Sequence, residues 1–309
     1  MSSVAEANSA VPLTVTYFDF QAAPGEKLRL CCVLGNIPFN DNRVKRSEWA
    51  DLKPLTPQGV LPILVEEGLP VKCQSEAILK YLGRKGGLYP TDGETYHIDA
   101  VLDLISDLDK AWSYPLYMGM RPQKFGYPEG SHQTEEGRQR TKALREQFVD
   151  TELKRFAGLF TKQLKDSGGM FICGSKPTIA DARLLPTLRS FQKGHIDFVP
   201  VTCLDGFPEL IGYIKYMMNL PAVKEWYAPP VVEFTKEELL NFRGVDGAPM
   251  YICAKGTVFD VTNVDFYAPG NSYNIFVGHD GTFLVFSDKL LGPFSSLTNK
   301  SLPLTLSFP

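Results

Sequence analysis

The spacing of apolar residues in the first part of the chain predicts a small mixed sheet with helices on its faces. The strand-like runs cover residues 13–20, 39–46, 61–65 and 71–73. The helical patterns cover residues 26–35, which end at Gly35, and Ser75 to Arg84. Between the second and third strands we expect a polar loop that holds Trp49 and Lys53. The polar "EEGL" of residues 66–69 predicts a hairpin between the last two strands.

The pattern of apolar residues changes after "GGLYPTDGE", and helical spacing then dominates as far as residue 226. Apolar residues recur one or two turns apart at Ile98, Val101, Leu102, Ile105 and Leu108. A second long amphipathic pattern runs from Arg138 to Lys165. Residues 95–226 are therefore predicted to be all-helical. The stretch "YAPPVVEF" then predicts a proline-stiffened linker at 227–233, and a strand-rich segment follows.

Composition narrows the functional classes. The 309 residues are 44% hydrophobic and 22% charged, typical of a globular protein of about two domains. The formal net charge of −3 gives no positive field for nucleic acid or anionic lipid, so we expect neither partner. The first dozen residues lack a signal-peptide pattern, and no apolar run approaches the length of a membrane span. We expect a cytoplasmic protein.

Cysteine and histidine spacing gives no metal signature. The six cysteines show no C-x-x-C pair and the four histidines no H-x-x-x-H pair, so we predict no metal site. Reduced, mostly buried thiols are the expected state. The adjacent Cys31 and Cys32 lie on the apolar face of a predicted helix, which favours packing over redox sensitivity.

Four stretches, taken in order and at their spacings, resemble cytosolic glutathione transferases: "LTVTYFDFQAAPGEKLRL", "SEWADLK", "QGVLPILVEEGLPVKCQSEAILKYL" and "KPTIADA". The resemblance covers roughly residues 13 to 227 and is nearest to the sigma class, which includes haematopoietic-type prostaglandin D synthases and S-crystallins. It implies an α/β thioredoxin-like N-terminal domain at 13–92, followed by an all-α glutathione transferase C-terminal domain at 95–226. It also implies glutathione as cosubstrate, a small-molecule electrophile and a homodimer.

The resemblance assigns the glutathione site to residues of the first domain. A cis Leu61–Pro62 bond would turn the backbone of Leu61 outward to pair with an extended tripeptide. A helix starting at Ser75 would offer unpaired N–H groups to a carboxylate, with Gln74 adding donors. The alternative makes Ser75 a plain N-cap and Pro62 a strand terminator. Trp49 and Lys53 match the family residues that bind the glycyl end of glutathione.

Tyr17 is the candidate catalytic residue. It matches the family tyrosine whose hydroxyl donates to the glutathione sulfur and so favours the thiolate, the nucleophilic form. By itself, a strand tyrosine is more often packing. Ala23 stands where sigma-like relatives carry a basic residue, which predicts weaker thiolate stabilisation and slower turnover.

Two further sets of residues come from the helical region. Asp107 matches the family aspartate that reaches the glutathione of the other subunit, although a solvated acid on a helix face is the plainer interpretation. Trp112, Tyr114 and Tyr117 follow on the same helix and are predicted to wall an apolar cosubstrate pocket. In "KPTIADA", Thr178 and Asp181 predict a capping box, which is a folding element.

The last segment resembles the cytochrome b5-like haem and steroid binding domain of the membrane-associated progesterone receptor type. The resemblance covers residues 234–282, with a helix from Lys236 to Phe242 and a hairpin in "PMYICAKGTVFDVT", and a divergent tail follows at 283–309. Bis-histidine ligation cannot form because the segment contains only His279. The resemblance implies haem ligation by Tyr273, with Tyr267 nearby. The tail lacks the acidic helices that close the family's pocket, so an incomplete module is the alternative.

Three functional classes follow from these features. The first, which the motifs favour, is a glutathione transferase that conjugates small apolar electrophiles or isomerises a prostaglandin-like substrate. The second is a weakly active or non-catalytic binding protein of the S-crystallin kind, as Ala23 would suggest. The third is a haem or steroid carrier in which the C-terminal segment dominates.

Overall fold

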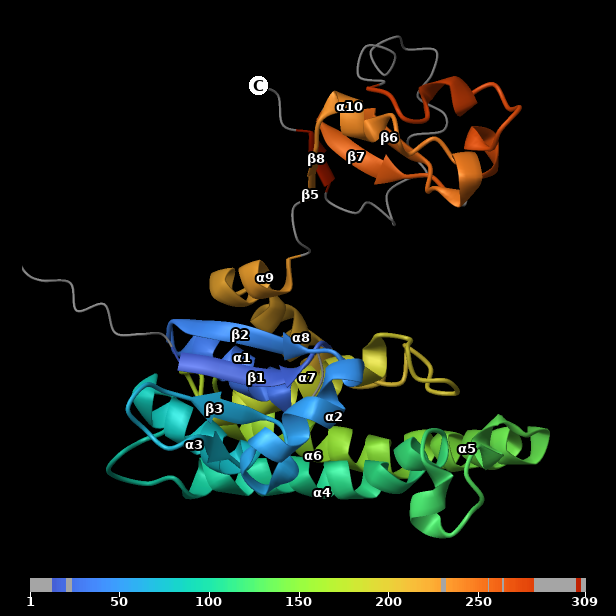
Figure 1. Ribbon diagram of the computed structural model, residues 1–309. Coiled ribbons are helices and arrows are strands. Elements are labelled where there is room, and N and C mark those ends of the chain that lie inside the picture. The colour runs from blue at the N-terminus through green and yellow to red at the C-terminus, as the bar shows by residue number, and fades with distance from the viewer. Residues whose placement is uncertain are drawn as a thin grey trace, which may run out of the picture. The chain divides into compact units, whose positions relative to one another are not determined.

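The computed structural model describes residues 13–20, 24–228, 232–254, 256–262, 264–280 and 304–306. Contacts divide the chain into two compact units, Met1–Trp226 and Tyr227–Pro309 (Figure 1). The division falls at the residue where the sequence analysis begins its linker. The expected boundary between the sheet domain and the helical domain lies inside the first unit.

The first unit contains a four-stranded mixed sheet of order β2-β1-β3-β4. Its strands are β1 (Leu13–Phe18), β2 (Phe39–Val44), β3 (Ile63–Val65) and β4 (Lys72–Cys73). Strand β1 pairs parallel with β2 and antiparallel with β3, and β3 pairs antiparallel with β4. Strand β3 begins only after Pro62, because a proline has no N–H for the ladder. The predicted strands and the hairpin are confirmed.

Three helices accompany this sheet: α1 (Gly25–Leu34), α2 (Trp49–Leu52) and α3 (Ser75–Lys85). Helix α1 packs between β1 and the helical half of the unit, because its residues from Leu28 to Cys32 are apolar apart from Arg29 and all are buried. The predicted polar loop around Trp49 and Lys53 is wrong. That segment is a series of short helical turns, and the backbone N–H of Lys45 donates to Glu48 at 3.0 Å to start it.

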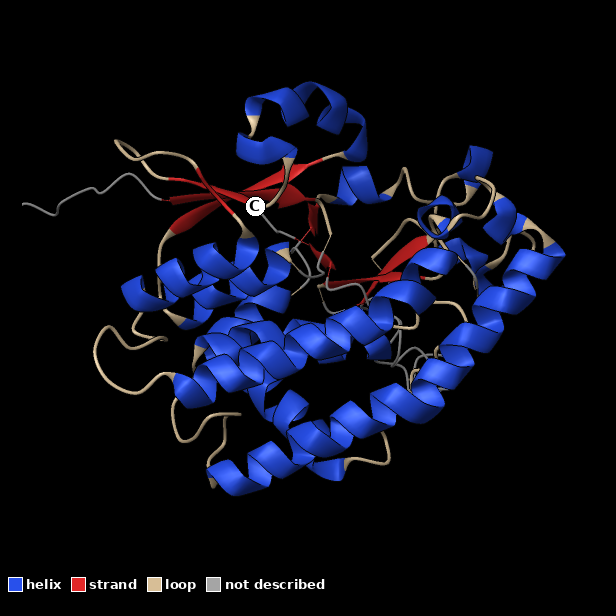
Figure 2. Cartoon of the chain, turned by 90° about the horizontal axis from the view of Figure 1, so that it is seen from below, coloured by secondary structure: helices blue, strands red, loops and turns tan. Residues whose placement is uncertain are grey.

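The second half of the unit is helical, as predicted. Its helices are α4 (Tyr96–Met118), α5 (Glu135–Phe148), α6 (Lys154–Ser167), α7 (Ile179–Gln192), α8 (Pro208–Asn219) and α9 (Pro221–Tyr227). A π-helical turn, Val149–Leu153, joins α5 to α6, so the long pattern expected from Arg138 to Lys165 is one bent helical stretch. Figure 2 shows the long helices lying alongside one another. Of the helices described, none is both long and apolar enough to cross a membrane.

The capping box predicted in "KPTIADA" is present at the start of α7. Asp181 accepts from the backbone N–H of Thr178 at 2.8 Å and also from that of Ile172 at 2.9 Å. The hydroxyl of Tyr213 donates to the same carboxylate at 3.0 Å. Asp181 is wholly buried, and burial raises its pKa. This carboxylate therefore ties α7, α8 and the preceding loop together.

The described residues of the second unit include a separate four-stranded sheet of order β5-β8-β7-β6 and a short α-helix. Its elements are β5 (Val232–Phe234), α10 (Lys236–Leu239), β6 (Tyr251–Ala254), β7 (Thr257–Asp260) and β8 (Leu304–Leu306). The antiparallel β6–β7 pair confirms the predicted hairpin. Helix α10 ends three residues before the predicted Phe242. Of the predicted tail, only β8 lies inside the described residues.

Candidate active site

The register of the first sheet brings together residues from three strands. Thr16 pairs with Ile63, and Ile63 pairs with Cys73. Because β3 runs opposite to β1 and β4, the next residues toward one end of the sheet are Tyr17, Pro62 and Gln74. One step further in the same direction come Leu61 and Ser75. The sequence separates these residues by up to 58 positions, and the sheet collects them at one end.

Tyr17 points from β1 toward the start of α1. Its side chain is only 6% exposed, and a Cβ atom on Gly25 would lie 2.1 Å from its ring, so only glycine fits there. Burial raises the pKa of Tyr17 to about 12, and the neighbouring Tyr117 adds to the rise, while Arg29 and Arg46 oppose it. The phenol therefore keeps its proton at neutral pH and can donate a hydrogen bond but cannot act as a base.

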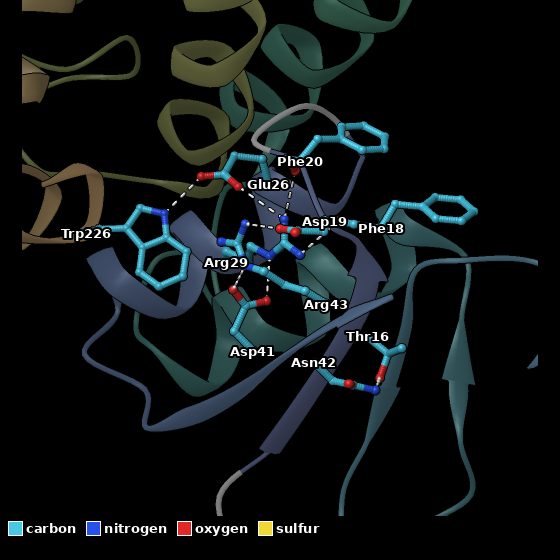
Figure 3. Close-up of polar contacts among 10 residues, drawn as sticks. All are labelled: Thr16, Phe18, Asp19, Phe20, Glu26, Arg29, Asp41, Asn42, Arg43 and Trp226. Atoms are coloured by element: carbon cyan, nitrogen blue, oxygen red, sulfur yellow. Dashed lines mark hydrogen bonds and ion pairs between the residues drawn. The ribbon is translucent and has the colours of Figure 1, made fainter. Parts of the chain in front are cut away.

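The chain directly after Tyr17 is held by a buried arginine (Figure 3). Arg29 on α1 donates to the backbone carbonyls of Phe18 and Phe20, at 3.3 and 3.1 Å. Its Nε donates to Asp41 on β2 at 2.7 Å, and Nη1 lies 3.4 Å from Glu26. The guanidinium is wholly buried, so each of these partners offsets the cost of removing it from water.

The same network extends to the neighbouring elements. Arg43 on β2 contacts Asp41 at 2.7 Å and Asp19 at 3.2 Å. The indole of Trp226, on α9, donates to Glu26 at 2.9 Å. Helix α9, helix α1 and strand β2 are thus joined around the end of β1, as the dashed lines of Figure 3 show.

The Leu61–Pro62 peptide bond is cis, as the sequence analysis expects. Opposite it, Gln74 has φ of 72° and Gln58 has φ of 61°, both in the left-handed region that few residues other than glycine adopt. The Gln74 amide donates to the Gln58 side chain at 2.6 Å. Unusual backbone of this kind gathers at functional sites, and here it lies beside Leu61 and Ser75.

Ser75 is the first residue of α3, and Gln74 occupies the N-cap position. The alternative in which Ser75 is the N-cap is therefore wrong, because its backbone is already helical. No side chain caps this end of the helix in the part of the chain described, so its first N–H groups face outward. Such an end attracts anions.

A cluster of four charged side chains fixes the first turn of α3. Glu76 accepts from Lys27 of α1 and lies 2.9 Å from Arg183 of α7. Arg183 also contacts Asp109 of α4, at 3.1 Å. Lys27 and Arg183 are both buried, and burial lowers the pKa of Lys27. The anion-attracting end of α3 is thereby anchored to three other helices.

Trp49 is the first residue of α2, and Lys53 follows its last residue. The ring of Trp49 meets Phe18 edge-on, with 5.7 Å between centroids, which places it beside the strand that carries Tyr17. The stem of Lys53 runs along the backbone of Gly59, 3.4 Å from where a Cβ would stand. Lys53 therefore folds back toward the residues that lead into Leu61. Ala23 lies outside the described residues.

Asp107 lies on the exposed side of α4, where it pairs with Lys110 at 2.9 Å. Its side chain is 59% exposed, so such a pair contributes little to stability. This exposure agrees with the solvated acid that the sequence analysis gives as the plainer interpretation.

The three predicted pocket residues of α4 differ in their surroundings. Tyr117 adds to the pKa shift of Tyr17, and Lys124 lies 4.0 Å from the centre of its ring. Tyr114 is 38% exposed and meets Phe125 edge-on at 4.7 Å.

Trp112, in contrast, is buried against Phe148 and Phe191, at 4.7 and 5.4 Å between ring centroids. These contacts favour a packing role for Trp112 within the helical core. Tyr114 and Tyr117 remain the better candidates for a pocket wall.

Tyr267 and Tyr273 meet in the second unit, with their ring centroids 6.0 Å apart. Tyr267 is wholly buried in a cluster with Met250, Ile252 and Val261. Tyr273 is partly buried and packs on the same cluster beside Phe276. Of the two rings, only that of Tyr273 is partly exposed, so only Tyr273 fits the predicted role of a haem ligand.

All six cysteines are free thiols. Cys31, Cys32 and Cys253 are buried, and burial raises the pKa of each, which agrees with the packing interpretation. Within the described residues there is no group of three or more His, Cys, Asp or Glu side chains arranged to hold a metal ion.

Arg29 and Gln58 were not predicted from the sequence, and Glu76 was given no role. Arg29 stands among Leu28, Leu30 and Cys31 on a predicted helix with an apolar face, and a charge that becomes buried there needs partners. That signal could have been found. Neither the left-handed backbone of Gln58 nor the partners of Glu76 leave a signal in the sequence.

Comparison with known proteins agrees with this architecture. Residues 33–84 match the glutathione S-transferase N-terminal domain, and residues 129–230 match the C-terminal domain. Glutathione S-transferase 1 of Ascaris suum is 34% identical over 215 residues, which cover 69% of this chain and 94% of that protein.

Two solved structures are also similar. Prostaglandin synthase D of Nilaparvata lugens has a TM-score of 0.56 at 25% identity, over 70% of this chain and 96% of that one. The monomeric glutathione S-transferase Na-GST-3 of the hookworm Necator americanus has a TM-score of 0.54 at 27% identity, over the same shares. Given this identity along nearly the whole Ascaris protein, and the matches to both glutathione S-transferase domains, the chain belongs to the glutathione S-transferase family.

Proposed function

We propose that the chain transfers the glutathione thiolate to small apolar electrophiles, with the Tyr17 phenol donating a hydrogen bond to the sulfur. Glutathione transfer is the activity of the family, and the role of Tyr17, the sigma-like class and the electrophile are the proposal. A free thiol has a pKa of about 8.5, so only a few per cent is thiolate at neutral pH. A donor that prefers the anion lowers that pKa and raises the reactive fraction.

The observation that carries the proposal is the row formed by Tyr17, Pro62 and Gln74 at one end of the sheet. This register, in which the backbone of Tyr17 is one position away from Leu61 and Ser75, supports a phenol donor beside the proposed glutathione site. A pKa of about 12 suits Tyr17 to donation at every physiological pH. The phenol also costs little reorganisation, because Gly25 and Arg29 hold its surroundings in place.

Glutathione would bind across this row as an extended peptide. The backbone of Leu61 would pair with its middle, and the N-terminus of α3, with Ser75 and Gln74, would take its γ-glutamyl carboxylate. Lys53 and Trp49 would hold the glycyl end, Lys53 as a point charge for that carboxylate. The left-handed Gln58, bonded to Gln74, would fix the rim of the site.

The electrophile would lie against Tyr117, which is close enough to Tyr17 to act on its pKa, and against Tyr114 on the same helix. Isomerisation of a prostaglandin-like substrate is the other reaction we consider, and the name of the similar Nilaparvata structure supports it. A homodimer, in which Asp107 meets the partner's glutathione, and a cytoplasmic location belong to the same proposal.

The test is retention on immobilised glutathione together with conjugation of a generic aryl halide. Wild-type protein should be retained and active, and Tyr17→Phe should be retained with a much lower kcat. If retention holds but both proteins are equally slow, the chain is a binding protein of the S-crystallin kind. Loss of retention in the wild type would contradict the glutathione site itself.

A further inference from the structure

We propose that Arg29 is a positioning residue for the Tyr17 phenol. The proposal rests on the function proposed for Tyr17 and adds the device that sets where its hydroxyl lies. The Arg29 guanidinium lies over the Tyr17 ring, 5.9 Å from its centroid, and it also holds the backbone after Tyr17 and the first turn of α1.

Arg29 holds the backbone directly after Tyr17. It donates to the carbonyls of Phe18 and Phe20, so it binds the chain at the first and third residues after Tyr17. Glu26, in the first turn of α1, is a further partner of Arg29, and its neighbour Gly25 lies against the Tyr17 ring. A shift of the end of β1 or of this first helical turn would therefore press on the ring or release it, because a core packs too densely to absorb the change.

The positive charge of Arg29 alone does not explain why an arginine stands at this position. Its guanidinium contacts two carboxylates, those of Glu26 and Asp41, and Arg43 shares Asp41. The guanidinium faces these negative partners, and its charge also acts on Tyr17, where it opposes the rise of the pKa caused by burial. What only arginine supplies is a planar fork with five donors, enough for two carbonyls and two carboxylates at once.

The two carboxylate partners of Arg29 are themselves held in place by other side chains. Asp41 lies on β2 and is held from its other oxygen by Arg43, at 2.7 Å. Glu26 is wholly buried and is held by the indole of Trp226. Arg29 thus sits in a frame built from β2, α1 and α9, and it transmits the rigidity of that frame to the residues that follow Tyr17 (Figure 3).

The experiment is a double-mutant cycle between Arg29→Met and Tyr17→Phe. The readouts are the pKa of the bound glutathione thiol, from its ultraviolet absorbance, and the separate kcat and KM. Arg29→Met should raise the thiol pKa by about one unit and lower kcat at neutral pH roughly tenfold, with KM for glutathione nearly unchanged. The double variant should be no slower than Tyr17→Phe alone, because both changes remove one interaction.

Arg145→Met is the matched control. Arg145 is also a buried arginine that donates to three backbone carbonyls, those of Pro115, Leu116 and Asp197. Its loss should destabilise the fold without moving the thiol pKa. Arg29→Lys keeps the charge but cannot reach all four partners, so it should behave like Arg29→Met, and it decides the question if the methionine variant does not fold.

Three results would overturn the proposal. They are a wild-type thiol pKa in the Arg29 variants, additive effects of Arg29→Met and Tyr17→Phe, or full rescue by lysine. Failure of the proposed function looks different, since the wild type would then show no lowered thiol pKa and Tyr17→Phe would change nothing.

Discussion

The indole N–H of Trp226 donates to the carboxylate of Glu26 at 2.9 Å, which joins two residues 200 positions apart. Glu26 is wholly buried on α1, and Trp226 stands near the end of the first unit on α9. The end of the helical half is thereby linked to the helix that begins beside Tyr17. Because of this contact, the stability of the first unit depends on its last helix, α9.

Replacing Trp226 by Phe should lower the free energy of unfolding by about 1–3 kcal/mol, because a buried carboxylate oxygen loses its donor. Phenylalanine keeps the aromatic contact with Phe39, which lies 5.6 Å away. Urea unfolding of Trp226→Phe, Glu26→Gln and the double variant measures the effect. The double variant should lose less than the sum of the two single losses. Simple additivity would mean that the two side chains are not coupled.

Ser75→Ala should weaken glutathione binding without changing the thiol chemistry. The hydroxyl is one of several donors proposed for the γ-glutamyl carboxylate, and a bond to a charged group is worth about 1.5–3 kcal/mol, so KM for glutathione should rise on the order of tenfold or more. Steady-state kinetics and the pKa of the bound thiol separate the two effects.

Ser190→Ala is the control for this change, because the Ser190 hydroxyl donates within α7 to the carbonyl of Thr187. It should leave KM as in the wild type. Equal values of KM for the two alanine variants would remove Ser75 from the proposed binding site.

The order of elements could be predicted from the sequence because local patterns determine it. The alternation in β1, the apolar spacing of α1 and α4, and the capping box of Thr178 and Asp181 are all short-range signals. The helical turn at Trp49 was missed, since its polar residues look like a loop, and the bond from the Lys45 N–H to Glu48 belongs to the turn before it.

The contacts of the site depend on pairings that the sequence does not contain. Glu76 looks like an ordinary acid in a first helical turn, and its partners Lys27 and Arg183 lie 49 and 107 positions away. Trp112 looks like a pocket wall beside Tyr114, and only the packing of α5 and α7 reveals its contacts with Phe148 and Phe191. Register and helix packing fix such contacts, and both are tertiary properties.

Asp181→Asn should be among the most destabilising single changes in the first unit. Both carboxylate oxygens accept backbone N–H groups, and an amide would turn a donor toward one of them. We expect a loss on the order of 2–4 kcal/mol in the free energy of unfolding, measured in urea. Asp150→Asn, which breaks an exposed pair with Lys154, should cost less than about 1 kcal/mol. Similar losses in both variants would contradict this account of Asp181.

The resemblance of the second unit to a haem-binding domain is tested by adding haemin to the whole protein. It predicts a Soret band that Tyr273→Phe abolishes, because the partly exposed Tyr273 is the proposed ligand. Tyr267→Phe removes only a buried hydroxyl and should keep the band. The absence of a band, or a band unchanged in Tyr273→Phe, would leave these tyrosines as core packing alone.

The pH dependence of activity should report the ionisation of the glutathione thiol and not that of the Tyr17 phenol. Thiolate formation predicts a rise in kcat/KM through a pKa below the usual value of about 8.5. Because burial raises the pKa of Tyr17 to about 12, its ionisation should cause no fall in kcat/KM up to about pH 10. An earlier fall that vanishes in Tyr17→Phe would show that the phenol ionises in that range.

The free energy of unfolding should report the ionisation of the Tyr17 phenol at higher pH. A tyrosine whose pKa is higher in the folded state than its unfolded value of about 10 binds more protons when folded, so its stabilising effect is complete below about pH 10. That effect is lost as the pH rises toward about 12, with a size on the order of 2–3 kcal/mol. The free energy of unfolding, measured in urea, should therefore fall more steeply between these pH values in the wild type than in Tyr17→Phe. Parallel curves would mean that Tyr17 is no more buried in the folded protein than in the unfolded chain.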